Sequence, residues 1–175
     1  MKDTRDTFVI ADTHFGHKNV IEYENRPFSS IEEMDNAMIN NWNKVVGGDD
    51  IVYVLGDFSF YGIDKTSKIL KQLNGVKKLV MGNHDRGRSA AWLRKAGFNE
   101  VYDTSIVLNE FLVLSHKPPE YFNAHTPYFY LYGHVHGTDM YENVTRNTAC
   151  VCVERWNYAP VNISKLLTMA EKFDK

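Results

Sequence analysis

The 175-residue sequence contains few cysteines, no long hydrophobic run and little excess charge of either sign. Its two cysteines, Cys150 and Cys152, do not have the C-x-x-C spacing of redox and zinc motifs. On an extended segment they would point to the same face, and free cysteine commonly packs as a small hydrophobic residue. We therefore interpret them as buried thiols rather than as a functional pair.

The sequence also has no apolar stretch of the length that a secretory signal or a membrane span needs. Near the N-terminus, only residues 8–11 form a short apolar run. A cytoplasmic protein without a membrane partner is therefore expected. The formal net charge of −2 gives no overall positive field, so long duplex nucleic acid is not an expected partner. A polyanionic ligand would have to be held locally, by metal ions or by a few cationic side chains.

No repeat, low-complexity tract or long linker marks a domain boundary. With 43% hydrophobic and 24% charged residues, a chain of this length can form one globular core. We expect residues 1–175 to be a single domain. Its oligomeric state is left open.

Apolar runs rich in β-branched and aromatic residues predict strands, and capping residues with helical spacing predict four helices. The helices are expected over residues 30–46, from Asp64 to Gly75, over residues 89–96 and after Ser164. Strands and helices alternate in the first half, whereas the second half is mostly strand, which favours an α/β sandwich of mixed sheets flanked by helices. The predicted strands cover residues 8–11, 51–55, 78–81, 105–108, 111–114, 128–132 and 148–153.

Acidic, amide and histidine side chains follow several of these strands. Asp12, Asp57 and Asn83 each come one or two residues after an apolar run, and ligands in such folds gather beyond the carboxyl ends of strands. In Asp12-x-His14 and His134-x-His136, extended backbone would send both side chains to the same side. A glycine precedes Asp57, Asn83 and His134, as expected where the backbone turns sharply or approaches a bound group closely. The polar set consists, in chain order, of Asp12, His14, Asp57, Asn83, His84, Asp85, His116, His134 and His136.

These ligand types suit two divalent metal ions. Imidazole nitrogens with carboxylate and amide oxygens favour Mn, Fe, Zn or Ni over Ca, and the metal identity stays open. Two divalent ions bring four positive charges and Asp12 with Asp57 return two negative ones, which leaves a positive centre for a phosphate ester. Two such ions can lower the pKa of a shared water to about 7 and so supply a hydroxide for in-line attack on phosphorus.

The ordered motifs from Asp12 to His136 resemble the calcineurin-like metallophosphoesterase superfamily. The resemblance implies a four-layer α/β/β/α sandwich. It also implies that Asp57 bridges two metal ions. The first ion would be bound by Asp12, His14 and His136, and the second by Asn83, His116 and His134.

The same resemblance implies a catalytic role for the residue pair that follows Asn83. His84 would stabilise the transition state and protonate the leaving oxygen, with Asp85 fixing its tautomer. Three further segments, residues 14–19, 25–28 and 154–158, are similar to a group of small bacterial and phage predicted phosphoesterases. One departure is that protein Ser/Thr phosphatases of this superfamily carry Asp-Arg-Gly after the bridging aspartate, whereas here residues 58–62 read FSFYG. This argues against a protein phosphatase.

Several residues near these motifs have two interpretations. His17 either contacts a substrate phosphate or hydrogen-bonds to backbone near the metal loop. Arg26 is a candidate for holding a second substrate group by a bidentate contact, although a solvated surface arginine is the more common outcome. His125 is interpreted as a residue outside the site. The aromatic residues within 121–132 are expected to fill the core rather than to stack on bases, since no basic stripe accompanies them.

Three functions compete on these observations. The leading one is hydrolysis of a phosphodiester or phosphomonoester bond in a small substrate, with diesters slightly favoured. The alternative within the same chemistry is a nuclease or a cyclic-nucleotide phosphodiesterase. The third, a catalytically silent interaction scaffold, is disfavoured because buried charged clusters are costly to keep without paired metals.

Overall fold

The computed structural model describes residues 5–121 and 125–174. Its first sheet has the strand order β4-β3-β2-β1-β9, in which β1 to β4 are parallel and β9 is antiparallel to β1. The strands alternate with helices along the chain, which is the connection that parallel pairing needs. The strand bounds are β1 (Thr7–Ile10), β2 (Ile51–Val54), β3 (Val76–Val80), β4 (Glu100–Tyr102) and β9 (Val161–Asn162).

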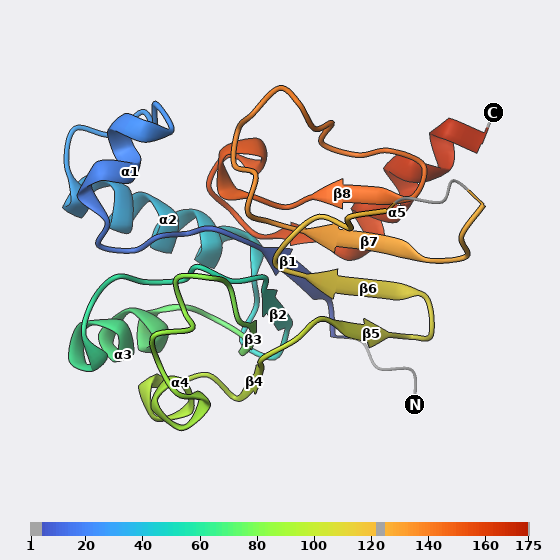
Figure 1. Ribbon diagram of the computed structural model, residues 1–175. Helices are drawn as coiled ribbons and strands as arrows, with labels where there is room; N and C mark the ends of the chain where they lie inside the picture. Colours follow the sequence, from blue (N-terminus) through green and yellow to red (C-terminus); the bar gives the residue numbers. More distant parts are fainter. Residues whose placement is uncertain (1–4, 122–124, 175) are drawn as a thin grey trace.

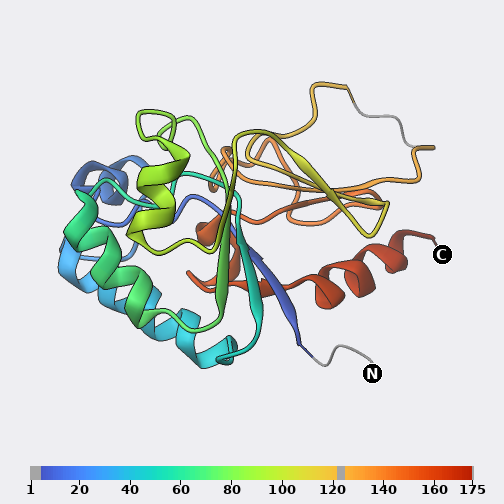
Figure 2. The same cartoon turned by 90° about the horizontal axis from the view of Figure 1, so that it is seen from below.

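The second sheet has the order β5-β6-β7-β8 and is also mixed. Strand β5 (Ile106–Leu108) is antiparallel to β6 (Leu112–Ser115), whereas β6, β7 (Phe129–Tyr132) and β8 (Thr148–Cys150) are parallel. The second sheet packs against one face of the first sheet, and helices α2 (Ile31–Val45), α3 (Ile63–Gln72) and α4 (Ala90–Ala96) cover the other face (Figure 1, Figure 2). The predicted sandwich of mixed sheets flanked by helices is therefore confirmed.

Strand β1 shows why the strands of the first sheet read as continuous apolar runs. Phe8 and Ile10 pack into the core beneath the helices, whereas Val9 and Ala11 pack into the core between the two sheets. Both faces of the strand are buried, so neither face needs polar residues. Strand β1 ends at Ile10, two residues before Asp12.

Helix α1 (Lys18–Tyr23) precedes α2 in the chain, between β1 and α2. Ser30 caps α2 as predicted, because its hydroxyl accepts a hydrogen bond from Glu33 N at 3.1 Å. Helix α3 is capped by Gly62 rather than by the predicted Asp64, which lies in its first turn. An acid there still favours the helix N-terminus electrostatically.

Helix α5 (Ile163–Ala170) packs against the core between the sheets, on the side away from α2, α3 and α4 (Figure 2). It begins before Ser164, with Asn162 as its cap, and the 3-10 helix η2 (Glu171–Asp174) follows it. Another 3-10 helix, η1 (Val153–Trp156), replaces the end of the predicted strand over residues 148–153. In the described part of the chain, no helix combines the length and the apolar stretch that crossing a membrane requires.

The aromatic residues before Gly133 divide between core and surface. Phe129 and Tyr132 are buried, as predicted, but Tyr121 is 90% exposed and Tyr128 is 38% exposed. Phe122 lies outside the described residues. The expectation of a core cluster therefore holds for Phe129 and Tyr132 in strand β7 and not for Tyr121 and Tyr128.

Candidate metal centre

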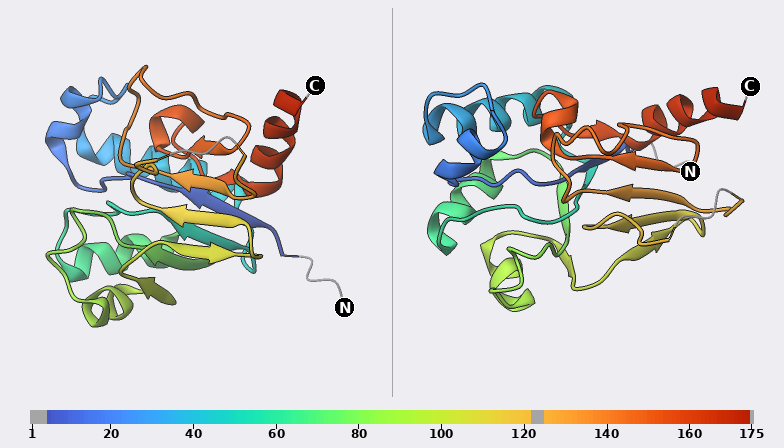
Figure 3. Two further views of the ribbon diagram at one scale, coloured as in Figure 1. Left: turned by 45° about the vertical axis from the view of Figure 1, so that its right-hand side comes forward. Right: turned by 45° about the horizontal axis from the view of Figure 1, so that its top comes forward.

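The polar motifs meet where the carboxyl ends of the two sheets come together. Asp12, Asp57 and Asn83 follow β1, β2 and β3 of the first sheet, whereas His116 and His134 follow β6 and β7 of the second. The arrowheads of β1, β6 and β7 point to the same side of the molecule (Figure 1; Figure 3, left). The parallel pairing within each sheet therefore places loops from distant parts of the sequence at one rim.

The backbone turns sharply at this rim. Five of the predicted metal ligands have a positive φ, a conformation that costs non-glycine residues of the order of 1–3 kcal/mol each. Such strain persists only where the surrounding structure imposes it, and it concentrates at functional sites. The five residues, with φ in degrees, are Asp12 (58), His14 (52), Asp57 (53), His134 (74) and His136 (49).

Two glycines allow these loops to approach one another closely, as the sequence predicted. A β-carbon on Gly82 would overlap with the carboxylate of Asp57. A β-carbon on Gly133 would overlap with Ala11 and with the carboxylate of Asp12. Any side chain at either position would therefore push the loops apart.

Asp12, His14 and His136 form the first cluster, which we call the Asp12 half. Asp12 Oδ1 lies 3.8 Å from His14 Nε2 and 3.9 Å from His136 Nε2. These separations are too long for hydrogen bonds but suit atoms that surround one ion with metal–ligand distances of about 2.0–2.2 Å. Asp12 Oδ1 and both ring nitrogens of His14 are buried without a hydrogen-bond partner. Since buried polar atoms without partners are costly, this half fits a metal ion.

Asn83, His116 and His134 form the second cluster, which we call the Asn83 half. His116 Nε2 lies 2.8 Å from Asn83 Oδ1 and 3.2 Å from His134 Nδ1. The other ring nitrogen of His116, Nδ1, lies 2.9 Å from the carbonyl oxygen of Leu55 and must donate a proton to it. The lone pair of Nε2 then faces the oxygen of Asn83, and two acceptors in such proximity favour a cation between them.

The carboxylate of Asp57 lies between the two halves. Its Oδ2 is 3.9 Å from His14 Nε2 and 3.6 Å from His116 Nε2. Its Oδ1 accepts a hydrogen bond of 2.9 Å from the backbone N–H of His84. Asp57 is 2% exposed, so its negative charge calls for nearby cations.

His84 belongs to neither half. Its side chain is 51% exposed, and its Nε2 lies 3.9 Å from Asp57 Oδ2. The ring stands 5.7 Å from that of His14 and 5.2 Å from that of Phe60, measured between centroids. An imidazole at this position can reach a substrate that sits over Asp57.

The prediction that Asp85 fixes the tautomer of His84 is wrong. The buried carboxylate of Asp85 accepts backbone hydrogen bonds from Asp57 N at 2.7 Å, Gly82 N at 2.9 Å and Phe58 N at 3.3 Å. Burial raises the pKa of this carboxyl, although these hydrogen bonds partly oppose the effect. Asp85 therefore joins the loops after β2 and β3 instead of contacting the catalytic candidate.

The predicted substrate contact of Arg26 is also corrected. Arg26 is 4% exposed, and protein atoms accept all five of its side-chain N–H bonds. The guanidinium donates to the backbone carbonyls of Asp12 and Thr13, to the sulfur of Met34 and twice to Glu154 Oε1. No N–H remains for a substrate, so Arg26 positions the Asp12 loop.

Glu154 was not predicted as a site residue. Its Oε1, which pairs with Arg26, also lies 3.0 Å from His136 Nδ1 and so directs His136 Nε2 toward Asp12. Burial lowers the pKa of His136, but the hydrogen bond to Glu154 and nearby carboxylates outweigh it and raise the pKa to about 9. Glu24 approaches the same pair. The available sequence signal was the similarity of residues 154–158 to the small phosphoesterase group.

His17 makes the backbone hydrogen bond that was one of its two interpretations. Its Nδ1 accepts from Val20 N at 2.9 Å and so caps α1. Burial lowers the pKa of His17, and its neighbours His14 and His84 lower it further. A substrate contact through Nε2 stays a prediction.

The two cysteines lie beside the Asp12 half as buried free thiols, which confirms their interpretation. Their Sγ atoms are 3.4 Å apart, and Cys152 donates a hydrogen bond of 3.3 Å to Asp12 Oδ2. This bond leaves Asp12 Oδ1 facing the histidines.

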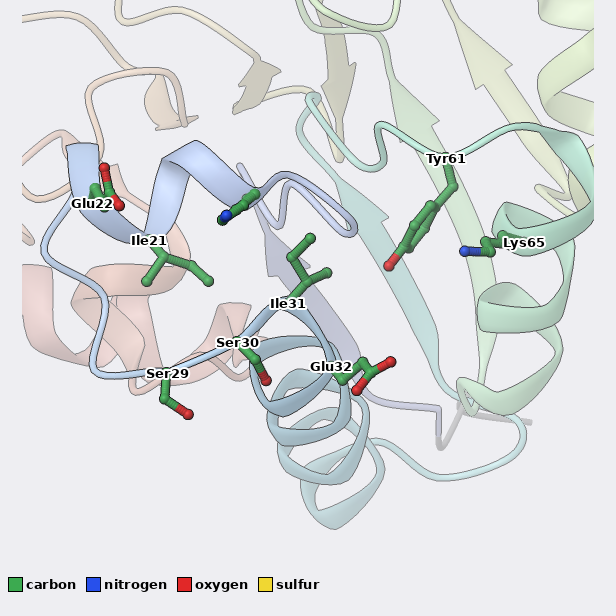
Figure 4. A pocket seen from close by; sticks show the side chains of 9 residues that line it. Ile21, Glu22, Ser29, Ser30, Ile31, Glu32, Tyr61 and Lys65 are labelled. Atoms are coloured by element: carbon green, nitrogen blue, oxygen red, sulfur yellow. The ribbon is translucent and has the colours of Figure 1, made fainter.

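A separate pocket of about 550 Å³ lies beside the loop after β1. It opens between α1, the start of α2 and the side chains of Tyr61 and Lys65 (Figure 4). None of the predicted metal ligands lines it. The pocket is therefore adjacent to the candidate centre without being part of it.

Comparisons with known proteins point to one family. Residues 7–163 match the family model described as calcineurin-like phosphoesterase. An uncharacterized protein of Methanocaldococcus jannaschii is 35% identical over 96% of this chain and 93% of its own length. The gene 66 protein of Mycobacterium phage L5 is 36% identical over 46% of this chain and 40% of its own length. The crystal structure of a protein of unknown function from Aquifex aeolicus superposes with a TM-score of 0.73 and 27% identity, covering 95% of this chain and all of that one.

Proposed function

The chain belongs to the calcineurin-like phosphoesterase family, and we propose that it hydrolyses phosphodiester or phosphomonoester bonds of a small substrate with two divalent metal ions. The observation that supports this most strongly is the set of buried, unpartnered atoms of Asp12 and His14 that face Asp57. A protein that had become an interaction scaffold would have no reason to keep such costly atoms. We include a cytoplasmic location in the proposal.

The residues would divide the work between binding and proton transfer. The Asp12 half and the Asn83 half would each hold one ion, and Asp57 would contact both. When bound, the ions would supply Lewis acidity toward a phosphoryl oxygen and an activated water as the nucleophile. His84, which is exposed beside Asp57, would orient the ester and donate a proton from its ring to the leaving oxygen as the P–O bond breaks.

A metal-reconstituted assay tests this proposal. Purified protein would be stripped of metal, loaded with Mn, Ni, Fe or Zn, and assayed with bis-p-nitrophenyl phosphate and p-nitrophenyl phosphate. We expect hydrolysis that depends on added metal and is absent from Asp57→Asn, which serves as the control for a contaminating phosphatase. Equal rates in the two proteins, or no hydrolysis with any of the four metals, would refute the proposal.

A further inference from the structure

Phe60 is a partly exposed aromatic ring surrounded by histidines of the candidate centre. The residue is 38% exposed. Its ring centroid lies 4.2 Å from that of His17, 5.4 Å from that of His14 and 5.2 Å from that of His84. Aromatic surface that stays in water can gain free energy when another apolar group covers it.

The backbone around Phe60 is held firmly. Phe60 N donates a hydrogen bond of 2.8 Å to the carbonyl of Phe15, in the loop that carries His14. The carbonyls of Ser59 and Tyr61, on either side, both accept hydrogen bonds from the guanidinium of Arg88. The ring is therefore presented by an ordered segment, and a ligand that contacts it would not have to order that segment on binding.

The ring of Phe60 lies next to His84, where the leaving group of a bound ester would have to sit. His84 is the residue proposed to donate a proton to the leaving oxygen, so the leaving group must sit next to its ring. The ring of Phe60 adjoins that of His84 on this side of the centre. A leaving group with a flat ring would cover the exposed surface of Phe60, whereas a short alkyl group would leave it in water.

The neighbouring pocket is a less suitable place for a flat ring. The ring of Tyr61 lines it (Figure 4), but one face packs on the backbone of Gly16 and the ammonium of Lys65 lies 4.8 Å from the ring centroid. The hydroxyl of Tyr61 donates to Asp35 Oδ2 at 3.0 Å. The Tyr61 ring already has protein partners, whereas that of Phe60 retains exposed surface.

From this geometry we infer that Phe60 forms a leaving-group subsite, and that the preferred substrates are phosphoesters whose leaving alcohol carries a flat ring, a class that includes nucleosides. The inference rests on the proposed phosphoester hydrolysis and names its substrate class. Contact with one aromatic ring is expected to change kcat/KM by roughly tenfold.

Benzyl phosphate and ethyl phosphate, or their methyl diesters, test the inference because both release alkoxides of similar basicity and only one carries a ring. In the metal-loaded enzyme, kcat/KM should favour the benzyl ester by about tenfold. Phe60→Ala should lower kcat/KM for the benzyl ester more than for the ethyl ester and so abolish that preference. For thymidine 5′-phosphate, the nucleoside probe, Phe60→Ala should lower kcat/KM as much as it does for the benzyl ester.

Matched variants distinguish a leaving-group subsite from a purely structural role of Phe60. Phe111 is 36% exposed and lies between β5 and β6, away from the centre, so Phe111→Ala should leave the preference unchanged. If Phe60→Ala lowers kcat/KM for the benzyl and ethyl esters equally, Phe60 only packs against the histidines and the inference is overturned. It is equally overturned if Lys65→Ala removes the preference, because the ring would then bind in the neighbouring pocket.

Failure of the proposed hydrolysis can be distinguished from failure of the Phe60 subsite. In that case no ester would be hydrolysed with any metal, and the subsite would be judged by binding of benzylphosphonate against ethylphosphonate, measured by saturation-transfer NMR. Tighter binding of benzylphosphonate that is lost in Phe60→Ala would support the subsite. Equal binding of the two phosphonates would overturn it.

Discussion

The two halves of the candidate centre are built in different ways. In the Asp12 half, all three residues have a positive φ, and Asp12 Oδ1 and both nitrogens of His14 lack partners. In the Asn83 half, only His134 has a positive φ, and His116 Nε2 already lies 2.8 Å from Asn83 Oδ1 and 3.2 Å from His134 Nδ1. The atoms of the first half have no protein partner, whereas in the second half a proton on His134 Nδ1 can satisfy His116 Nε2 and leave only Asn83 Oδ1 facing an acceptor.

The side chains that hold the ligand loops in place also differ between the two halves. An ion pair between Arg26 and Glu154, 2.6 Å apart and 128 positions apart in the sequence, holds His136 and the Asp12 loop. Asp85 holds the loop of the Asn83 half through backbone N–H groups alone. Since an ion in the Asn83 half must replace existing contacts, we expect the Asp12 half to bind metal more tightly.

Asp57→Asn should have the largest effect on metal content and on hydrolysis, because it should empty both halves alike. One carboxylate faces both clusters, so its neutralisation should remove both ions and reduce hydrolysis to the rate of metal-free protein. Elemental analysis of the purified variant, beside the wild type, measures this. Full occupancy of two ions in the variant would rule out a shared carboxylate.

His84→Ala should leave both halves intact and act on the chemistry alone. We expect kcat for an alkyl ester to fall by about 10² to 10⁴, the usual scale for a positioned acid, with the metal content unchanged. Because p-nitrophenolate leaves without protonation, the loss should be smaller with aryl esters. Unchanged turnover of the alkyl ester would remove His84 from the mechanism.

Glu154→Gln should weaken metal binding in the Asp12 half only. The change removes the charge that orients His136, and loss of such a partner typically costs about 10- to 100-fold in metal affinity. Calorimetric metal titration should show weaker binding in the Asp12 half and no change in the Asn83 half. An equal loss in both halves would show that Glu154 supports the fold rather than His136, and circular dichroism would check that the variant is folded.

Metal removal should produce the smallest of these effects, a loss of thermal stability. An ion at 100 times its Kd adds about 2.7 kcal/mol to the free energy of unfolding, so chelation should lower the Tm by several degrees. His14→Ala should lose more of this metal-dependent stabilisation than Asn83→Ala, measured by thermal denaturation with and without metal. The reverse order would contradict the comparison of the two halves.

The fold and the convergence of the polar motifs at one rim could be predicted because both follow from local sequence patterns. Residues buried on both faces of β1 and β2 give apolar runs, and parallel strands end at a common rim, so the order of the motifs indicated the site. Short elements were missed: α1, β4 and β9 have two to six residues each and give no periodic signal.

The supporting residues could not be predicted, because long-range partners decide their role. Arg26 next to a proline is typical of a surface turn, and its burial is explained by partners distant in the sequence, Glu154 and the backbone carbonyls of the Asp12 loop. Asp85 adjoins His84 in the sequence, yet the turn directs its carboxylate to the backbone of the β2 loop. The subsite proposed for Phe60 had no sequence signal either, since an aromatic residue after a strand is usually part of the core.

Anomalous diffraction from crystals soaked in Mn²⁺ tests the central claim most directly. We expect two peaks roughly 3.5–4 Å apart, one among Asp12, His14 and His136 and the other among Asn83, His116 and His134, with the Asp57 carboxylate between them. A single peak, or two peaks that do not share Asp57, would contradict that claim.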